Sequence, residues 1–453
     1  MSQKALFGPG YDSMNSDEKS SLLPDDTISK PPPKDTFLVA YFIFFLHGIG
    51  HLAPWNFFIT ATAYFDEKFS CVPNSTVPCH DFRTSYENFF SVGANLPLVI
   101  MTALNVYLQT RFQYGHRMTV SLVTLWILFV ITTIFVKVKT AQWLPGGFMA
   151  LTLICVILMN FASAAFQSST FGLSGLLPSK YTSIVMSGQA VAGVFTSLAN
   201  IISLAIADST ETAALAYFCC AVIIVLLCLL SLLVLTRLEF VKYYLRNTTA
   251  QHSKNAEADM GAKGGHKAAV FVTVIREILG KIWLYALSVF LVFAVTLSVF
   301  PGVTSKIVSV DRDTDQSSPW SGKYFTPLTC FLLFNVGDFV GRYITHWAIL
   351  FTDGRVLLLL SVLRLCFIPL FAICNAVPRT HPALLMSDVY PIFLTSLLGL
   401  TNGYLGSIAM IVAPQKLSKK HAETGSTFMA LALTGGLFVG GVLSFLLVAS
   451  LKW

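Results

Sequence analysis

Residues 334–343 read Phe-Asn-Val-Gly-Asp-Phe-Val-Gly-Arg-Tyr and lie inside an apolar stretch that runs from about Tyr324 to Leu350. That stretch is long enough to cross a bilayer as a helix. Asp338 and Arg342 are four residues apart, so the two charges share one face of the helix. Charged side chains at such depth are costly and usually face a protein interior or a water-filled path. The stretch therefore predicts a membrane-spanning helix with one polar face.

The whole chain has the composition of a membrane protein. Of its 453 residues, 55% are hydrophobic and 12% are charged, whereas soluble domains carry about 25% charged residues. The net charge of +7 comes from basic residues scattered through the loops, so it does not indicate a nucleic-acid partner. Walker, serine-hydrolase and zinc-protease motifs are missing from the sequence, so we expect no enzyme, no cofactor and no metal site.

Apolar segments predict eleven transmembrane helices. We place the spans at about 37–64, 87–109, 118–137, 145–168, 181–206, 213–236, 277–300, 324–350, 355–376, 387–412 and 424–450. Lys and Arg are about twice as frequent in loops on the side of the N-terminus as in the opposite loops, which predicts a cytosolic N-terminus and a lumenal or extracellular C-terminus. In the last span, Gly436-x-x-x-Gly440 predicts close packing against another helix.

Two polar segments divide the chain into units. Residues 1–35 have the composition of a disordered cytosolic tail. Residues 237–276 form a predicted cytosolic linker between a six-helix bundle over 36–236 and a five-helix bundle over 277–453. The predicted fold class is an all-α polytopic membrane protein with a major-facilitator-like 6+5 two-bundle architecture. We expect the protein to be a monomer in the lipid bilayer.

Two short motifs in polar segments bear on processing and sorting. Asn74 begins an Asn-Ser-Thr sequon in the loop after the first span, where we expect glycosylation. Cys71 and Cys79 lie in the same loop and either form a local disulfide or remain free thiols. In the tail, residues 18–23 match an acidic dileucine pattern that endosomal and lysosomal sorting adaptors bind, through Glu18, Leu22 and Leu23.

The charged pair at Asp338 and Arg342 has two interpretations. It either fixes the bundle as an intrahelical ion pair or recognises a polar solute. The guanidinium group of Arg342 offers donors in a planar fork, and a carboxylate accepts hydrogen bonds from hydroxyl groups. A vicinal diol presents oxygen atoms at a suitable spacing for both groups, so this pattern favours a solute with neighbouring hydroxyls.

Other polar residues of the apolar spans also have two interpretations. His47 and His51 are four residues apart and are either hydrogen-bonded structural residues or proton-sensitive groups. Gln167 either joins helices or contacts a solute through its donors and acceptor. Glu423 precedes the last span, where it either complements a helix N-terminus or contributes to a pH dependence.

A set of motifs along the membrane region resembles the equilibrative nucleoside transporter family. The motifs include Pro54-Trp-Asn-Phe-Phe58, Gly172-Leu-Ser-Gly-Leu-Leu-Pro178, Met186-Ser-Gly-Gln189, the Phe334–Arg342 stretch and Asn402-Gly-Tyr-Leu405. The resemblance implies a facilitative carrier of purine and pyrimidine nucleosides, and of nucleobases as an extension. The eleven-span topology of that family agrees with the span count above.

The resemblance also implies which residues bind the solute. Asp338 and Arg342 match the ribose-contacting pair of the family, while Trp55 and Gln167 match positions that line the cavity and contact the base. The full set of expected substrate-binding residues is Leu52, Trp55, Asn56, Ile59, Asn95, Gln167, Asn335, Asp338 and Arg342. His51 and Asn95 depart from the residues common among relatives at those positions.

The dileucine tail and Ser387-Asp-Val-Tyr-Pro391 look closest to the lysosomal branch of the family. The resemblance therefore favours the membrane of late endosomes and lysosomes over the plasma membrane. It also favours acid-stimulated, proton-linked transport, with His47, His51 and Glu423 as the pH-sensing candidates. Two other functions stay open at this point: a carrier of organic cations or monoamines with the same fold, and a membrane receptor or channel.

Overall fold

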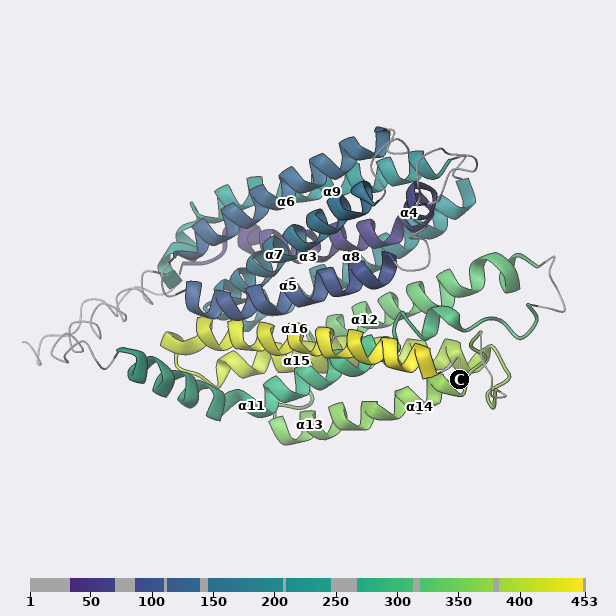
Figure 1. Ribbon diagram of the computed structural model, residues 1–453. Coiled ribbons are helices and arrows are strands. Elements are labelled where there is room, and N and C mark those ends of the chain that lie inside the picture. The colour runs from purple at the N-terminus through teal and green to yellow at the C-terminus, as the bar shows by residue number, and fades with distance from the viewer. Residues whose placement is uncertain are drawn as a thin grey trace, which may run out of the picture.

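A computed structural model describes residues 33–69, 86–109, 112–138, 146–206, 209–245, 267–312, 318–377 and 383–450. Within these ranges the chain is helical, apart from turns and two isolated β-bridges, Ile307–Ala376 and Cys374–Leu385. The helices run side by side and are grouped in two bundles, one above the other in Figure 1. The predicted all-α membrane architecture is thereby confirmed.

The first bundle holds six long helices and one short one. They are α3 (Val39–Thr60), α4 (Thr62–Phe69), α5 (Tyr86–Leu108), α6 (Tyr114–Lys137), α7 (Gly147–Gly175), α8 (Ser179–Ile206) and α9 (Thr210–Leu235). The second bundle holds α11 (Lys267–Val299), α12 (Leu333–Ile344), α13 (Gly354–Leu363), α14 (Phe367–Ala372), α15 (Val389–Gln415) and α16 (Lys419–Ser450). Helices α3, α11 and α16 all begin at one face of the molecule, at the left of Figure 1, and we call it the N-terminal face.

The helices match the predicted spans. Within the described ranges, nine helices are long and apolar enough to cross a membrane, and α5 adds the shorter apolar stretch Gly93–Leu108. The eighth predicted span is a composite of two π-helical segments, η4 (Trp320–Tyr324) and η5 (Pro327–Leu332), followed by α12. All eleven predicted spans therefore fall on helical segments.

Several boundaries differ from the prediction, and three of them change how the chain is interpreted. Helix α11 begins at Lys267 rather than near residue 277, so the polar linker is shorter than its composition indicated. Helix α12 ends at Ile344, before the predicted end at Leu350. Helix α6 begins at Tyr114, so Arg117 lies in a helix and not in the predicted loop. Its side chain is only 7% exposed. Arg117 tolerates burial because it has polar partners, described below.

Small residues set the helix contacts that build the site. A methyl group added to Gly341 would overlap the carbonyl oxygen of Leu400, and one added to Gly403 would overlap that of Asp338. Helices α12 and α15 therefore approach closely along Gly337-x-x-x-Gly341 and Gly399-x-x-x-Gly403, as small residues permit in membrane proteins. The predicted packing role of Gly436 and Gly440 is confirmed, because these glycines contact the α11 backbone at Phe290 and Ala294.

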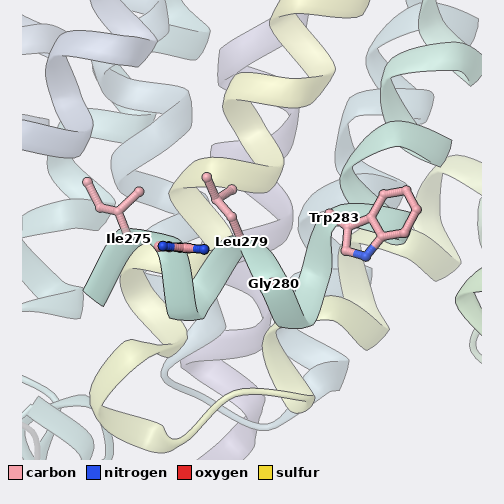
Figure 2. Close-up of a pocket in the computed structure, with 5 residues that line it drawn as sticks. Ile275, Leu279, Gly280 and Trp283 are labelled. Carbon is pink, nitrogen blue, oxygen red and sulfur yellow. The ribbon is translucent and has the colours of Figure 1, made fainter. Parts of the chain in front are cut away.

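The outer surface of α11 carries a mostly apolar hollow that Arg276 also lines. This shallow hollow of about 430 Å³ surrounds Gly280, between Ile275, Leu279 and Trp283, as Figure 2 shows. Trp283 is 53% exposed and nothing lies within 4 Å of a methyl group added to Gly280. Exposed apolar side chains on a membrane helix face lipid. This hollow is therefore part of the lipid-facing surface and is separate from the buried charges of α12.

Candidate functional site

The charged pair predicted on the eighth span is present and buried. Asp338 and Arg342 both lie on α12, and each is 4% exposed. The Nε atom of Arg342 donates a hydrogen bond of 2.8 Å to Oδ2 of Asp338, one helical turn earlier. A paired, hydrogen-bonded charge costs far less in an apolar interior than an isolated one. The spacing of four residues thus gives the ion pair that the sequence predicts.

Arg342 also reaches across to the first bundle. Its Nη1 atom donates to the carbonyl oxygen of Met186 and to Oε1 of Gln189, both at 3.2 Å and both on α8. The Nε2 atom of Gln189 lies 3.2 Å from Nδ1 of His51 on α3. The guanidinium group therefore joins α12 to α8, and through Gln189 to α3, at the boundary between the two bundles.

The other oxygen of the Asp338 carboxylate binds within the second bundle. Oδ1 accepts a hydrogen bond of 2.6 Å from Nδ2 of Asn402 on α15. Oδ1 of Asn402 accepts from Oγ1 of Thr296 on α11 at 2.8 Å, and Thr296 Oγ1 in turn accepts from Nη2 of Arg364 at 2.6 Å. Both carboxylate oxygens of Asp338 are thus held by protein groups.

Arg364 brings a second positive charge close to this carboxylate. The residue opens the short 3-10 segment η6 (Arg364–Cys366), is 3% exposed, and also donates to the Leu398 carbonyl oxygen and the Thr401 hydroxyl. Across the described ranges Arg364 forms no ion pair. One carboxylate therefore lies among two guanidinium groups in the interior of the second bundle, and the local charge is positive.

The residues expected to meet the base lie in the first bundle. Trp55 on α3 is half-buried and stacks on Phe58, with ring centroids 5.8 Å apart. Gln167 on α7 is 3% exposed, and its Oε1 atom has no hydrogen-bond partner in the part of the chain that the structure describes. Leu52 and Asn56 are half-buried on α3, and Ile59 lies on the same helix.

Two expected residues contact the facing bundle. The Nδ2 atom of Asn335 donates to Oγ of Ser197 on α8 at 2.8 Å and to the Phe331 carbonyl oxygen at 3.0 Å. Asn95 on α5 is half-buried and lies against Gly441 of α16. The structure therefore places both residues at contacts between the two bundles, and the side chain of Asn335 joins α12 to α8.

The three pH-sensing candidates have separate environments. His47 is fully buried between Phe44 and Phe166, with Nε2 lying 3.1 Å from Oγ of Ser231. His51 instead faces Gln189 and the charged pair. Glu423 lies on α16 at the N-terminal face, where its Oε1 accepts from Nη2 of Arg117 on α6 at 3.0 Å. A role in sensing pH stays a prediction for all three.

Comparison with known proteins decides the family. A family model described as "Nucleoside transporter" matches residues 153–449. Equilibrative nucleoside transporter 1 of Rattus norvegicus is 35% identical over 92% of this chain and 98% of its own length. The chain belongs to the equilibrative nucleoside transporter family. The recognised family, its carrier function and the absence of an enzyme role are thereby confirmed.

Relatives within the family are similar to this transporter at nearly equal levels. Equilibrative nucleoside transporter 1 of Homo sapiens is 36% identical over 91% of this chain and 98% of its own length. Equilibrative nucleoside transporter 3 of Rattus norvegicus is 33% identical over 92% of this chain and 90% of its own length. Identities so close together do not single out a branch.

A solved structure supports the fold of the transporter. The fucose:proton symporter of E. coli shares 13% sequence identity, with a TM-score of 0.52 over 92% of this chain and 96% of that chain. At this identity the likeness shows the fold alone. The major-facilitator-like architecture predicted from the span count is therefore confirmed.

Sequence reasoning missed four residues of the transporter's polar network: Gln189, Thr296, Arg364 and Asn402. Gln189 and Asn402 stood in the quoted motifs without an assigned role, and the intramembrane charge of Arg364 was expected only to pair or cap locally. For Gln189 and Asn402 the available signal was a polar side chain beside a glycine, because small residues mark where helices touch. The partner helix itself is set by tertiary packing.

The remaining predictions about this transporter concern other parts of the chain. Glu18, Leu22, Leu23, Cys71, Asn74 and Cys79 lie outside the described residues. The dileucine signal, the sequon and the choice between disulfide and free thiols remain predictions from the sequence.

Proposed function

We propose that this transporter moves nucleosides by alternating access, with the solute bound between the two bundles at Arg342 and Asp338. The observation that carries the proposal is that Arg342 touches both bundles. Its Nη1 atom binds α8 while its Nε atom binds Asp338 on its own helix. A group at such a boundary changes its surroundings whenever the bundles rock against each other around a central site.

Arg342 retains a donor for the solute. Its Nη2 atom makes no hydrogen bond within the described ranges and is not fully enclosed by protein. Guanidinium nitrogens donate in one plane, which suits two neighbouring hydroxyl oxygens. Asp338 already binds protein groups through both oxygens, so we assign the direct ribose contact to Arg342 and an orienting role to Asp338.

Gln167 and Trp55 supply the complementary features for a base. A buried acceptor without a partner costs about 1–3 kcal/mol, and an N–H group of a bound base would offset that cost at Gln167 Oε1. The half-buried indole ring of Trp55 offers an aromatic face for stacking. We propose that Leu52 and Asn56 continue this wall of α3, and that Asn95 and Asn335 shape its edges from the bundle contacts, while a role for Ile59 stays a prediction from the resemblance.

The charge balance disfavours the alternative of an organic cation carrier. Two guanidinium groups and one carboxylate surround the proposed ribose site, so a cationic solute would meet net positive charge. Like charges in a medium of low dielectric constant repel strongly. Neutral solutes with several hydroxyl groups avoid this penalty, and a nucleoside is such a solute.

Contacts between the bundles indicate how the carrier opens and closes. At the N-terminal face Glu423 binds Arg117, Gln109 binds Thr424 and Thr427, and Ser187 Oγ lies 3.0 Å from Nε2 of His346. The distribution of Lys and Arg supports a cytosolic position for this face. We infer that the transporter is closed on the cytosolic side in this structure.

Location and proton coupling belong to the same proposal. The tail motif at Glu18, Leu22 and Leu23 supports late endosomes and lysosomes over the plasma membrane. His51 contacts Gln189, which binds Arg342, so protonation of this imidazole would alter the polar contacts beside the ribose site. We therefore place His51 first among the groups through which pH acts, ahead of His47 and Glu423.

Counterflow in proteoliposomes tests the proposed function. Vesicles loaded with unlabelled adenosine should accumulate radiolabelled adenosine and uridine faster than protein-free vesicles, at pH 5.5 and at pH 7.4. Tetraethylammonium inside should drive no such exchange. Exchange of the cation with no exchange of nucleosides would favour the organic cation carrier and defeat the proposal.

A further inference from the structure

Asn402 is placed against Asp338 by the glycine contact between α12 and α15. It lies directly before Gly403, whose added methyl group would overlap the backbone of Asp338, and three residues after Gly399, which meets the backbone of Phe334. Asn402 is 3% exposed, so water does not compete for its amide. The tight backbone approach allows the short side chain to reach the carboxylate at 2.6 Å.

The amide of Asn402 has one orientation that satisfies its neighbours. An ionised carboxylate only accepts hydrogen bonds, so the group facing Oδ1 of Asp338 is the NH₂ group. The oxygen of the amide then faces the Thr296 hydroxyl at 2.8 Å, and this hydroxyl lies equally close to the Val292 carbonyl oxygen. The donor and the acceptor of Asn402 are therefore both used, each on a different partner.

Two guanidinium groups, those of Arg342 and Arg364, are connected to the carboxylate of Asp338. Arg342 binds Oδ2 directly, whereas Arg364 is connected to Oδ1 only through Thr296 and Asn402. A carboxylate that turned toward Arg364 would release Arg342 from its orientation. The hydrogen-bonded connection from the carboxylate to the second guanidinium group runs through the amide of Asn402 and the Thr296 hydroxyl.

We propose that Asn402 is a positioning residue for transport, which fixes the Asp338 carboxylate so that Arg342 presents its free Nη2 atom to the solute. This inference rests on the proposed role of Arg342 in binding the ribose. It assigns to Asn402 no contact with the solute. It predicts that the donor on Asn402, more than its volume, determines the affinity for a nucleoside.

Asn402→Asp converts this donor into a pH-dependent one. A protonated carboxyl group has nearly the shape of the amide, and its O–H can donate to Asp338 while its carbonyl oxygen accepts from Thr296. An ionised carboxyl group lacks the donor and repels Asp338, and two carboxylates that share a site hold one proton to raised pH. Uptake by this variant, divided by uptake by the parent, should therefore rise as pH falls.

The experiment measures adenosine uptake into proteoliposomes at pH 5.5, 6.5 and 7.4. We expect the ratio of Asn402→Asp to parent to be at least fivefold higher at pH 5.5 than at pH 7.4, mainly through a lower KM. Asn402→Leu, which keeps the branching at Cγ but is larger and lacks the donor, should raise KM several-fold at every pH. Monodisperse elution of each variant before reconstitution establishes that it is folded.

Asn160→Asp is the matched control. The amide of Asn160 is buried on α7 and donates at 2.9 Å to the Val156 carbonyl oxygen of its own helix. This variant introduces the same carboxyl group into the membrane interior away from Asp338, and its ratio to parent should vary less than twofold with pH. An equal acid response in both variants, or a flat ratio for Asn402→Asp, would overturn the inference.

One more variant distinguishes failure of this inference from failure of the proposed function. Arg342→Ala in the same vesicles tests the ribose site without reference to Asn402. Loss of uptake in Arg342→Ala together with a flat pH ratio in Asn402→Asp would leave the proposed site standing and reject the role of Asn402. Parental uptake by Arg342→Ala would reject the proposed site, and with it the reason for positioning Asp338.

Discussion

The Nη1 atom of Arg342 lies 3.2 Å from Oε1 of Gln189, and the two residues belong to different bundles. The same guanidinium group is held at 2.8 Å by Asp338 on its own helix. Arg342 is therefore oriented from both sides of the boundary at which the bundles meet. Rearrangement of the bundles has to break or exchange one of these contacts, which links movement of the protein to the state of the solute site.

Removal of the Gln189 acceptor should weaken nucleoside binding. Gln189→Leu leaves Nη1 of Arg342 with the carbonyl oxygen and the sulfur of Met186, and a hydrogen bond to a charged group is worth about 1.5–3 kcal/mol. We expect KM for adenosine to rise roughly tenfold or more on that basis. Gln415→Leu, at an exposed position at the end of α15, is the control and should keep the parental KM. A parental KM in Gln189→Leu would show that this contact does not orient Arg342.

The glycine contact between α12 and α15 should be intolerant of a methyl group. Gly403→Ala forces its added carbon into the backbone of Asp338, and such overpacking costs about 1–3 kcal/mol. We expect a lower melting temperature in detergent and reduced uptake. Gly280→Ala, on the lipid-facing hollow of Figure 2, meets no atom and should keep or raise the melting temperature. Equal melting temperatures for the two variants would contradict the packing described here.

The ion pair between Arg117 and Glu423 should act as a closing contact at the N-terminal face. Arg117→Glu and Glu423→Arg each place two like charges across the bundle boundary, so each should reduce uptake at least fivefold. The double exchange restores opposite charges and should recover part of the lost uptake. If the double variant transports no better than the worse single variant, the pair does not control closure.

The tail motif should direct the transporter to late endosomes and lysosomes. Leu22→Ala combined with Leu23→Ala removes both leucines that an adaptor would bind, so the protein should move to the cell surface in fluorescence microscopy. Leu6→Ala combined with Phe7→Ala removes two apolar residues elsewhere in the tail and should leave the distribution unchanged. If the protein stays in lysosomes after both leucines are replaced, the motif does not direct its sorting.

The sequence predicted the fold and the charged pair well because both depend on local patterns. Apolar length determines a span, and a spacing of four residues is sufficient to bring Asp338 to Arg342 on one helix. These features need no knowledge of which helices are neighbours. Gln167 is buried with an acceptor left over, and the choice between joining helices and contacting a solute stays a prediction.

The rest of the site depends on helix pairing, which the sequence alone does not specify. Asn402 is 64 residues from Asp338 along the chain, and Gln189 is 153 residues from Arg342. Arg117 was placed in a loop because helix α6 begins four residues earlier than the apolar run, and its partner Glu423 is 306 residues away. Two histidines on one helix likewise face different helices, because His47 and His51 meet α9 and α8.

The central claim, that Arg342 binds the ribose hydroxyls, is tested most directly by comparing uptake of adenosine with uptake of 2′,3′-dideoxyadenosine. The parent transporter should prefer adenosine at least tenfold, because the analogue lacks the two oxygens that Nη2 would contact. Arg342→Ala should reduce adenosine uptake to the level of the analogue, while Arg355→Ala, at an exposed position at the start of α13, should keep the parental preference. An undiminished preference for adenosine in Arg342→Ala would contradict the account.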